Sequence, residues 1–442
     1  MRQAAGKKGE LHYVQSLSYD SNGIGAFVKN ILIVHSYHYE FPLRKTTSAY
    51  LFSFKRYANA RCFYWNAFLW SMPSFLKKVP WDAVIFTDLF AMERWLPTTW
   101  PNVVKNVDWI KDLSCPKALI PQDEYIHTDQ LNQLIRTLGI SHLFSCANAQ
   151  DVRKIYAEID WTKVSYKQVL TGYIDERFVD ELEKHQGPQP PRDLDITYRT
   201  KRISPSLGRK GVIKSNIAGV VETAARERGL NTDISLDKNK VILGKKWFAF
   251  LQRSRWTIGT EGGSGILDHD GSLLPRVEAY VARYPSASFE EIEAIFFPSR
   301  DGEINLFAIT PRNFEACVAK TGQILIRGDY NGILRAGEHY LPIEPDFSNL
   351  SEVLEQSKDE NLRLRMVDNT YRDIVMSGKY GYDGFVRTVL GELPLNNTSR
   401  QNSAYEYLAW YLVRTLENLC WFVIALYRSL GVLVARATRR TR

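Results

Sequence analysis

Short apolar, β-branched runs alternate with stretches of helical periodicity through most of this 442-residue chain. The first run, NILIVHS at 30–36, ends in small and polar residues, as a buried parallel strand does before its loop. Later runs are WDAVIFTD at 81–88, KALIPQDE at 117–124 and SHLFSCA at 141–147, with helix-like DQLNQLIRTLG at 129–139 and NAQDVRKIYAEI at 148–159. This alternation predicts a doubly wound α/β fold.

The alternation is interrupted at EKHQGPQPPRD, 183–193, whose prolines and glycine do not continue a helix. It resumes with LDITYR at 194–199, KSNIAGVVETAARERGL at 214–230, RWTIGTE at 255–261 and GQILIRGDY at 322–330. We therefore expect two α/β domains, 29–182 and 194–390, with a ligand cleft between them. The other expected segments are a flexible tail at 1–28, linkers at 183–193 and 391–403, and a C-terminal helix at 404–442.

Composition restricts the compartment and the partners. The five cysteines are an odd number, lie far apart and form no zinc-type pattern, so we expect reduced thiols in a cytoplasmic protein. The N-terminus carries no apolar run of signal-peptide length. The net charge of +8 is concentrated in residues 192–214 and 404–442. The nearly neutral remainder argues against a long nucleic-acid track and favours two local anion sites.

The last segment, 404–442, is rich in Trp, Tyr, Leu and Val. If 404–436 is one helix, its polar residues share one narrow stripe and the rest of its surface is apolar. Arg428 interrupts the run before it reaches the length of a spanning helix. We expect an amphipathic helix lying in the membrane surface, with the closing RRTR against anionic lipid. A spanning helix and docking to protein are the alternatives.

The segment TPRNFEACVAKTG, 310–322, predicts a helix with an acidic residue close to its start. Thr310 suits the cap, Pro311 the first helical position and Gly322 a left-handed end. Glu315 then lies on the flank of the buried face. It either serves the helix dipole alone or takes part in binding.

The segment DITYRTKRISPSLGRKGVIKSNIA, 195–218, joins a strand end to a helix start through cations and glycines. A loop of this kind can bring basic side chains onto a diphosphate, since helix N–H groups and guanidinium forks both favour anions. The alternative is a solvated basic loop. The cations concerned are Arg199, Arg209, Lys210 and Lys214.

The segment GTEGGSGILDHDG, 259–271, is a glycine-rich turn after an apolar strand. Gly262 and Gly263 would let backbone amides approach a ligand, and Glu261 is suited to accept hydrogen bonds from hydroxyl groups. The segment contains neither a Walker motif nor a dinucleotide fingerprint. His269 lies between two aspartates, but one turn offers too few converging ligands, and we expect no metal.

Several of these stretches are familiar together. The segment ITPRNFEACVAKTGQILIRGDYNGILRAGEHYLPIEPDFSNLSEVL, 309–354, resembles the C-terminal domain of bacterial glycosyltransferases of the GT-B fold, in the group-1-like branch of surface-polysaccharide clusters. PQDEY at 121–125, LTGYIDERF at 170–178 and EGGSG at 261–265 extend the resemblance to about residues 30–390. It implies two Rossmann-like doubly wound domains facing a cleft, here followed by the amphipathic helix.

The resemblance also implies roles for matching residues. Glu315 is similar to the second glutamate of a paired motif that holds the ribose hydroxyls of a nucleotide. Its partner is expected eight residues earlier, where this chain has Phe307, so we expect Glu261 to replace it, with 272–308 as an insertion. Arg199 and Lys210 are implied as the cations on the leaving diphosphate. Further expected contacts of the nucleotide are Gly262, Gly263, Ser264, Arg312 and Lys214.

In the first domain, Asp123 and Glu124 follow a strand on the side expected to face the cleft. Either is a candidate to orient an acceptor hydroxyl or to act as its base. The alternative is that they only cap the next helix. His35 and His38 are weaker candidates.

The resemblance implies a metal-independent, retaining enzyme that moves a hexose or related sugar from a nucleotide diphosphate donor to a glycan or glycolipid. The setting would be synthesis of a bacterial surface polysaccharide such as O-antigen or capsule. We expect no cofactor besides the donor, no nucleic-acid partner, and a peripheral position on the inner face of the cytoplasmic membrane. The alternatives are a GT-B sugar-nucleotide epimerase and a non-catalytic GT-B scaffold, which the broken glutamate pair makes plausible.

Overall fold

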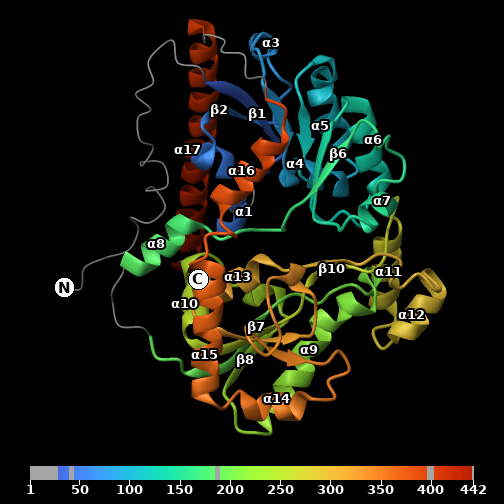
Figure 1. The fold of residues 1–442 in the computed structure, drawn as a ribbon, viewed down its shortest axis with the longest axis vertical. Helices are drawn as coiled ribbons and strands as arrows, with labels where there is room; N and C mark the ends of the chain where they lie inside the picture. The colour runs from blue at the N-terminus through green and yellow to red at the C-terminus, as the bar shows by residue number, and fades with distance from the viewer. Residues whose placement is uncertain (1–27, 39–43, 185–189, 396–402, 441–442) are drawn as a thin grey trace.

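The computed structural model describes residues 28–38, 44–184, 190–395 and 403–440. The expected tail therefore lies outside the described residues except for residue 28, as do parts of both expected linkers. Two α/β bodies lie one above the other in Figure 1, the N-terminal one in blue to cyan and the C-terminal one in green to orange.

The first body is built on a six-stranded parallel sheet in the order β2-β1-β3-β4-β5-β6. Along β1, Leu32 and Val34 enter the core on one face of the sheet, while Ile31 and Ile33 enter the core on the other. Burial on both faces explains the unbroken apolar run of this strand. The strands are β1 (Lys29–His35), β2 (Ala60–Asn66), β3 (Ala83–Phe86), β4 (Lys117–Leu119), β5 (His142–Ser145) and β6 (Ser165–Gln168).

The second body holds a five-stranded parallel sheet in the order β13-β12-β9-β7-β8. The predicted α/β class, with two doubly wound domains, is thus confirmed. The strands of the second body are β7 (Leu194–Arg199), β8 (Thr232–Ser235), β9 (Ser254–Gly259), β12 (Gly322–Ile326) and β13 (Leu341–Ile343).

Helices cover both sheets. In the first body they are α1 (Lys45–Leu51), α2 (Ser53–Tyr57), α3 (Ser74–Lys77), α4 (Asp88–Met92), α5 (Trp100–Val107), α6 (Thr128–Leu138), α7 (Asp151–Ile155) and α8 (Glu176–Lys184). In the second they are α9 (Arg209–Arg226), α10 (Lys245–Gln252), α11 (Leu273–Arg283), α12 (Phe289–Phe296), α13 (Pro311–Val318), α14 (Leu350–Gln356) and α15 (Glu360–Thr370). The chain then returns to the first body through α16 (Tyr382–Glu392) and α17 (Ala404–Arg440).

The helix expected at 310–322 is α13, and it ends earlier than its glycine suggested. Lys320, at φ 53°, takes the left-handed position after the helix, so the expectation for Gly322 was wrong. Gly322 instead opens β12, where a Cβ atom would lie 2.4 Å from the ring of Trp256. Close packing against this indole, rather than backbone conformation, explains the glycine.

A short antiparallel hairpin and two helices inserted in the second body reach across to the first. The hairpin pairs β10 (Gly262–Ser264) with β11 (Leu306–Ala308). Beyond β10, Asp268 donates its backbone N–H to the carbonyl of Tyr125 at 2.7 Å and accepts from the N–H of His127 at 2.8 Å. The residues of this insertion that join the apolar core of the first body are Leu267, Ile304 and Leu306.

Helix α17 packs along the edge strand β2 (Figure 1). The buried Glu406 accepts a hydrogen bond from Asn30 Nδ2 at 2.6 Å and pairs with Arg61 at 3.7 Å, and Glu417 pairs with Lys55 at 3.4 Å. Acidic groups of the helix therefore face the protein. Among the described residues, no helix combines the length and the hydropathy that crossing a bilayer requires.

Candidate ligand-binding cleft

The order of the second sheet reverses between β7 and β9, which is where open α/β sheets bind ligands at the carboxyl ends of their strands. A pocket lies at this place. Its lining includes Tyr198 from β7, Thr257 to Gly259 from β9, Lys214 from α9, Trp247 from α10 and Arg312 from α13. The pocket therefore combines an indole with two cations.

Lys214 and Arg312 give this pocket its positive charge. Burial, together with the neighbouring Arg312, lowers the pKa of Lys214 to about 8, against the opposing effect of Asp123. In the described part of the chain, neither cation has a carboxylate within ion-pair distance. A partly buried lysine beside an exposed arginine, neither with a carboxylate in ion-pair range, forms a suitable site for an anion.

Glu315 lies at the edge of the same pocket. Its Oε2 accepts a hydrogen bond from Trp247 Nε1 at 2.7 Å. Burial raises the pKa of Glu315 to about 7, against the opposing effects of the indole bond and of Arg312. A carboxylate beside an indole and a guanidinium is able to accept bonds from hydroxyl groups of a ligand.

Glu261, the expected partner of Glu315, has different contacts. It is 6% exposed. Its Oε1 accepts the backbone N–H of Tyr330 at 2.9 Å, and its Oε2 pairs with Lys210 at 2.9 Å. The ammonium of Lys210 also lies 4.3 Å from the ring centroid of Phe307. Glu261 and Phe307 thus meet at one lysine, while Glu315 meets Trp247.

The glycines after Glu261 serve the hairpin. Gly263 has φ 145°, and a Cβ there would lie 1.7 Å from the carbonyl oxygen of Leu306. Ser264 donates its hydroxyl to the carbonyl of Ile266 at 2.8 Å. Gly262 alone borders the pocket, because a Cβ there would lie 3.7 Å from the ammonium of Lys214.

Other cations of the basic loop point elsewhere. Arg199 Nη2 lies 2.7 Å from Asp233 Oδ1 on the adjacent strand β8, and its guanidinium lies over the ring of Phe250. Arg209 pairs with Glu290 at 2.7 Å on α12. The structure therefore separates the four cations and directs Lys214 into the pocket.

Asp123 faces this pocket from the first body. Its backbone is left-handed at φ 49°, which is rare for a residue other than glycine and is typical of functional loops. Although the residue is exposed, the surrounding protein desolvates its carboxylate and raises its pKa, while Arg94, Lys214 and Lys201 lower it. Asp123 is therefore electrostatically coupled to cations of the other body, across the cleft.

Glu124, in contrast to Asp123, is not exposed to the cleft. It is fully buried and accepts bonds from the hydroxyl of Ser145 at 2.6 Å, the N–H of Cys146 at 2.8 Å and the hydroxyl of Tyr156 at 2.7 Å. Both of its oxygens are used inside the first body.

Asp88 was missed by the sequence reasoning. It follows β3, beside the place where the order of the first sheet reverses between β1 and β3, and its Oδ1 is buried without a hydrogen-bond partner. Burial, with a smaller effect of Asp123, raises its pKa to about 7. The signal was available, since the run at 81–88 ends in this carboxylate.

His35 and His38, the weaker candidates, both have hydrogen-bond partners within the protein. His35 is buried, which lowers its pKa to about 3 and keeps the ring neutral. His38 Nε2 lies 2.7 Å from Glu93 Oε2, and its ring stacks on Phe68.

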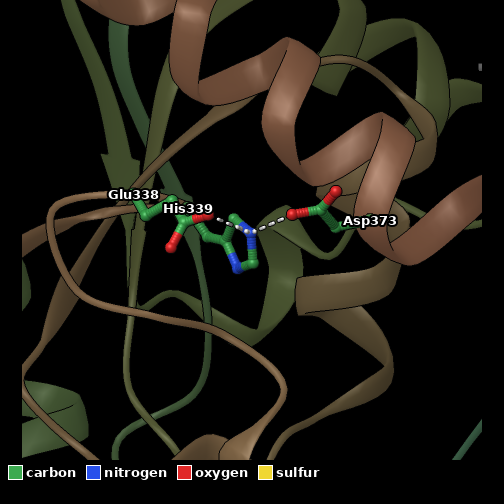
Figure 2. Close-up of side chains that lie close together, drawn as sticks. All are labelled: Glu338, His339 and Asp373. Carbon is green, nitrogen blue, oxygen red and sulfur yellow. Dashed lines mark hydrogen bonds and ion pairs between the residues drawn. The ribbon is translucent and has the colours of Figure 1, made fainter.

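In the described residues, Glu338, His339 and Asp373 form one group of potential metal ligands (Figure 2). His339 Nδ1 accepts the N–H of Arg335, which leaves Nε2 to donate to Asp373 at 3.2 Å. The guanidinium of Arg335 bonds both Glu338 and Asp373. A cation already neutralises these carboxylates and no imidazole lone pair is free, so the group fits an ion-pair network better than a metal.

In the glycine-rich turn, His269 Nδ1 lies 2.8 Å from the hydroxyl of Thr128.

No protein-family model matches the sequence, and the comparison with curated proteins gives no match. Among solved structures, the chain is similar to TarM, with a TM-score of 0.42 and 9% identity over 72% of this chain and 56% of that chain. It is similar to an alpha-glucosyltransferase in complex with UDP-glucose and DNA containing an abasic site, with a TM-score of 0.48 and 8% identity over 82% and 98%. It is also similar to sucrose-phosphate synthase from Thermosynechococcus elongatus, with a TM-score of 0.44 and 8% identity over 82% and 98%. The chain thus spans little more than half of TarM, and likeness at this level does not extend to activity or residue roles.

The pKa of Glu315 makes stability depend on pH. Because the folded-state pKa of about 7 lies above the usual 4.5, this group favours the folded state below pH 4.5, and that contribution is lost as pH rises through 7. Glu315→Gln cannot ionise, so its unfolding free energy relative to the wild type should rise by up to about 3 kcal/mol between pH 4.5 and 8. Urea denaturation across this range measures the difference. The exposed Glu352→Gln is the control, and a difference for Glu315→Gln that does not change with pH would contradict the assignment.

Proposed function

We propose that this protein is a glycosyltransferase whose nucleotide diphosphate sugar binds in the pocket between β7 and β9. The observation that carries the proposal is the pair Lys214 and Arg312, which lack an ion-pair partner in the described residues and lie at the reversal point of the sheet. A diphosphate suits these cations, a nucleobase suits the indole of Trp247, and ribose hydroxyls suit Glu315. Glu261 then supports the site through Lys210 and Tyr330 instead of contacting the ribose.

In this proposal Lys214 and Arg312 take the part first expected of Arg199 and Lys210. As the acceptor oxygen bonds to the anomeric carbon, the bond from that carbon to the diphosphate oxygen breaks and its electron pair stays on the diphosphate. The two cations stabilise this growing negative charge without a metal. Hexose transfer is part of the proposal on the strength of the family resemblance alone. The resemblance also implies retention of configuration, which requires the acceptor to attack on the face that the diphosphate leaves.

Asp123 is the residue we assign to the acceptor. It lies across the cleft from the cations, and its pKa is raised above the usual value, which favours uptake of a proton. Its carboxylate would hold the acceptor hydroxyl and accept the proton that the hydroxyl loses. Glu124, enclosed by three donors, is assigned a structural part.

We further propose that α17 holds the enzyme on the inner face of the cytoplasmic membrane, where a glycan or glycolipid of surface-polysaccharide synthesis is extended. Its inner face is anchored by Glu406 and Glu417, and its outer face exposes large apolar side chains to solvent. These are Tyr405, Leu408, Tyr411, Leu412, Leu416, Leu419, Phe422, Val423 and Leu426. A helix with its charges turned inward and its apolar face outward suits a lipid surface.

Nucleotide binding tests the main proposal. In a thermal-shift panel of UDP, GDP, ADP, CMP and TDP, at least one diphosphate should stabilise the fold, by about 2.7 kcal/mol at 100 times its dissociation constant. Lys214→Ala should weaken that binding about tenfold or more, because one cation of the site is lost. The exposed Lys105→Ala should bind as the wild type does. Absence of any response to the whole panel would refute a nucleotide-sugar enzyme.

Replacement of Asp123 tests the acceptor assignment. Asp123→Asn keeps the shape of the side chain but cannot take a proton, so kcat should fall by about 10² to 10⁴ while the nucleotide dissociation constant changes little. Sugar release from the donor and nucleotide binding are measured on the same preparation. Full transfer activity of the Asp123→Asn variant would show that Asp123 does not accept the proton of the acceptor hydroxyl.

The outer face of α17 is tested by vesicle flotation. The triple variant Leu408→Gln, Leu419→Gln and Phe422→Gln changes only exposed side chains, so the fold and nucleotide binding should persist. Binding to vesicles with anionic lipid should decrease by about tenfold or more, since three buried apolar side chains would be lost from the membrane contact. Equal flotation of wild type and variant would argue against the membrane contact.

A further inference from the structure

A second hollow, of about 860 Å³, opens between the two bodies. The end of β6, the loop after β12 and the helix α16 frame it. It shares no lining residue with the pocket between β7 and β9. Its size is within the range of small-molecule sites.

Basic side chains predominate among the charged lining residues of this hollow. Lys167, Lys379 and Arg387 line it, against the single carboxylate of Asp329. In the described chain, Lys379 has no ion-pair partner, while Lys167 pairs with Glu392 at 2.7 Å and Arg387 with Asp383 at 2.6 Å. Because both pairs are solvent-exposed, they contribute little and can give way to another anion.

An apolar wall lies beside the cations. Val169 and Phe385 are buried and contribute to the core beneath, while Leu170 and Tyr173 are partly exposed at the wall. The hollow thus offers a charged region and an apolar region side by side, which matches a ligand with an anionic group attached to an apolar part.

The loop after β12 is strained where it borders the hollow. Tyr330, Asn331 and Gly332 are consecutively left-handed, at φ 46°, 55° and 67°, and such strain in a bulky residue marks ligand-binding loops. Glu261 holds this conformation through the N–H of Tyr330, and Asn331 Oδ1 accepts the N–H of Ile309 at 2.8 Å. The loop therefore links the hollow to Glu261, the residue before β10, which lies beside the first pocket.

We infer that this hollow binds the phosphate-bearing part of the acceptor. The anion lies among Lys379, Lys167 and Arg387, and any attached apolar chain lies against the wall at Leu170 and Tyr173. The inference rests on the proposed glycosyltransferase function, and it makes the acceptor a phosphorylated compound, either lipid-borne or soluble.

The test uses the full chain carrying Lys214→Ala, so that the first pocket binds anions weakly. Inorganic pyrophosphate and geranyl diphosphate are titrated by calorimetry, with and without Lys379→Glu. Both ligands should bind, and Lys379→Glu should weaken each by about tenfold or more, because a repulsive charge replaces an attractive one. Lys379→Arg should keep the binding, and the exposed Lys105→Glu serves as the matched control.

Equal affinity for the two ligands would identify a soluble phosphorylated acceptor, and about tenfold tighter binding of geranyl diphosphate would identify a lipid-borne one. Absence of binding, or binding that Lys379→Glu leaves unchanged, would overturn the inference. The nucleotide panel fails or succeeds independently of this titration, so a failure of the second site is distinguishable from a failure of the proposed enzyme.

Discussion

The guanidinium of Arg94 determines how the two bodies meet. It is fully buried and donates to the main-chain carbonyls of Ala91 at 2.7 Å, Asp123 at 2.6 Å and Ile126 at 3.0 Å. A buried charge is tolerated only when its donors are satisfied, so the loop after β4 must keep its carbonyls turned inward. That geometry places Asp123 toward the cleft and brings the carbonyl of Tyr125 to its hydrogen bond with the backbone N–H of Asp268. One side chain thus supports both the candidate site and the contact between the bodies.

The cleft has opposite charges on its two sides. On the side of the first body lie the carboxylates of Asp88, which follows β3, and Asp123, which follows β4, and the pKa of each is raised. On the side of the second body the pocket at the reversal point is lined by the cations Lys214 and Arg312, with Glu315 at its edge. Such a division suits a reaction in which one side accepts a proton while the other stabilises a departing anion. The strained loop after β12 lies between this cleft and the second hollow.

The sequence predicted what depends on local pattern. The two parallel sheets follow from the apolar runs, and the start of α13 follows from Thr310, whose N–H bonds Asn313 Oδ1 at 3.0 Å. Side-chain direction depends on distant neighbours and was not predictable. The guanidinium of Arg199 pairs with Asp233, thirty-four residues later, instead of entering the pocket. The carboxylate of Glu124 accepts hydrogen bonds from Ser145 of β5 and from Tyr156, the residue after α7. The place of Glu261 likewise depends on Lys210 and on the loop after β12.

The insertion that follows β10 has a consequence for the order of folding. Leu267, Ile304 and Leu306 complete an apolar core whose other members come largely from residues before 165. During synthesis the first body therefore emerges with part of its core uncovered, and it stays so until Leu306, and after it Ala409 and Val413 of α17, have been made. The two bodies have separate sheets in the folded protein, but they are not separate folding units. The nascent first body depends on residues of the second to complete its apolar core.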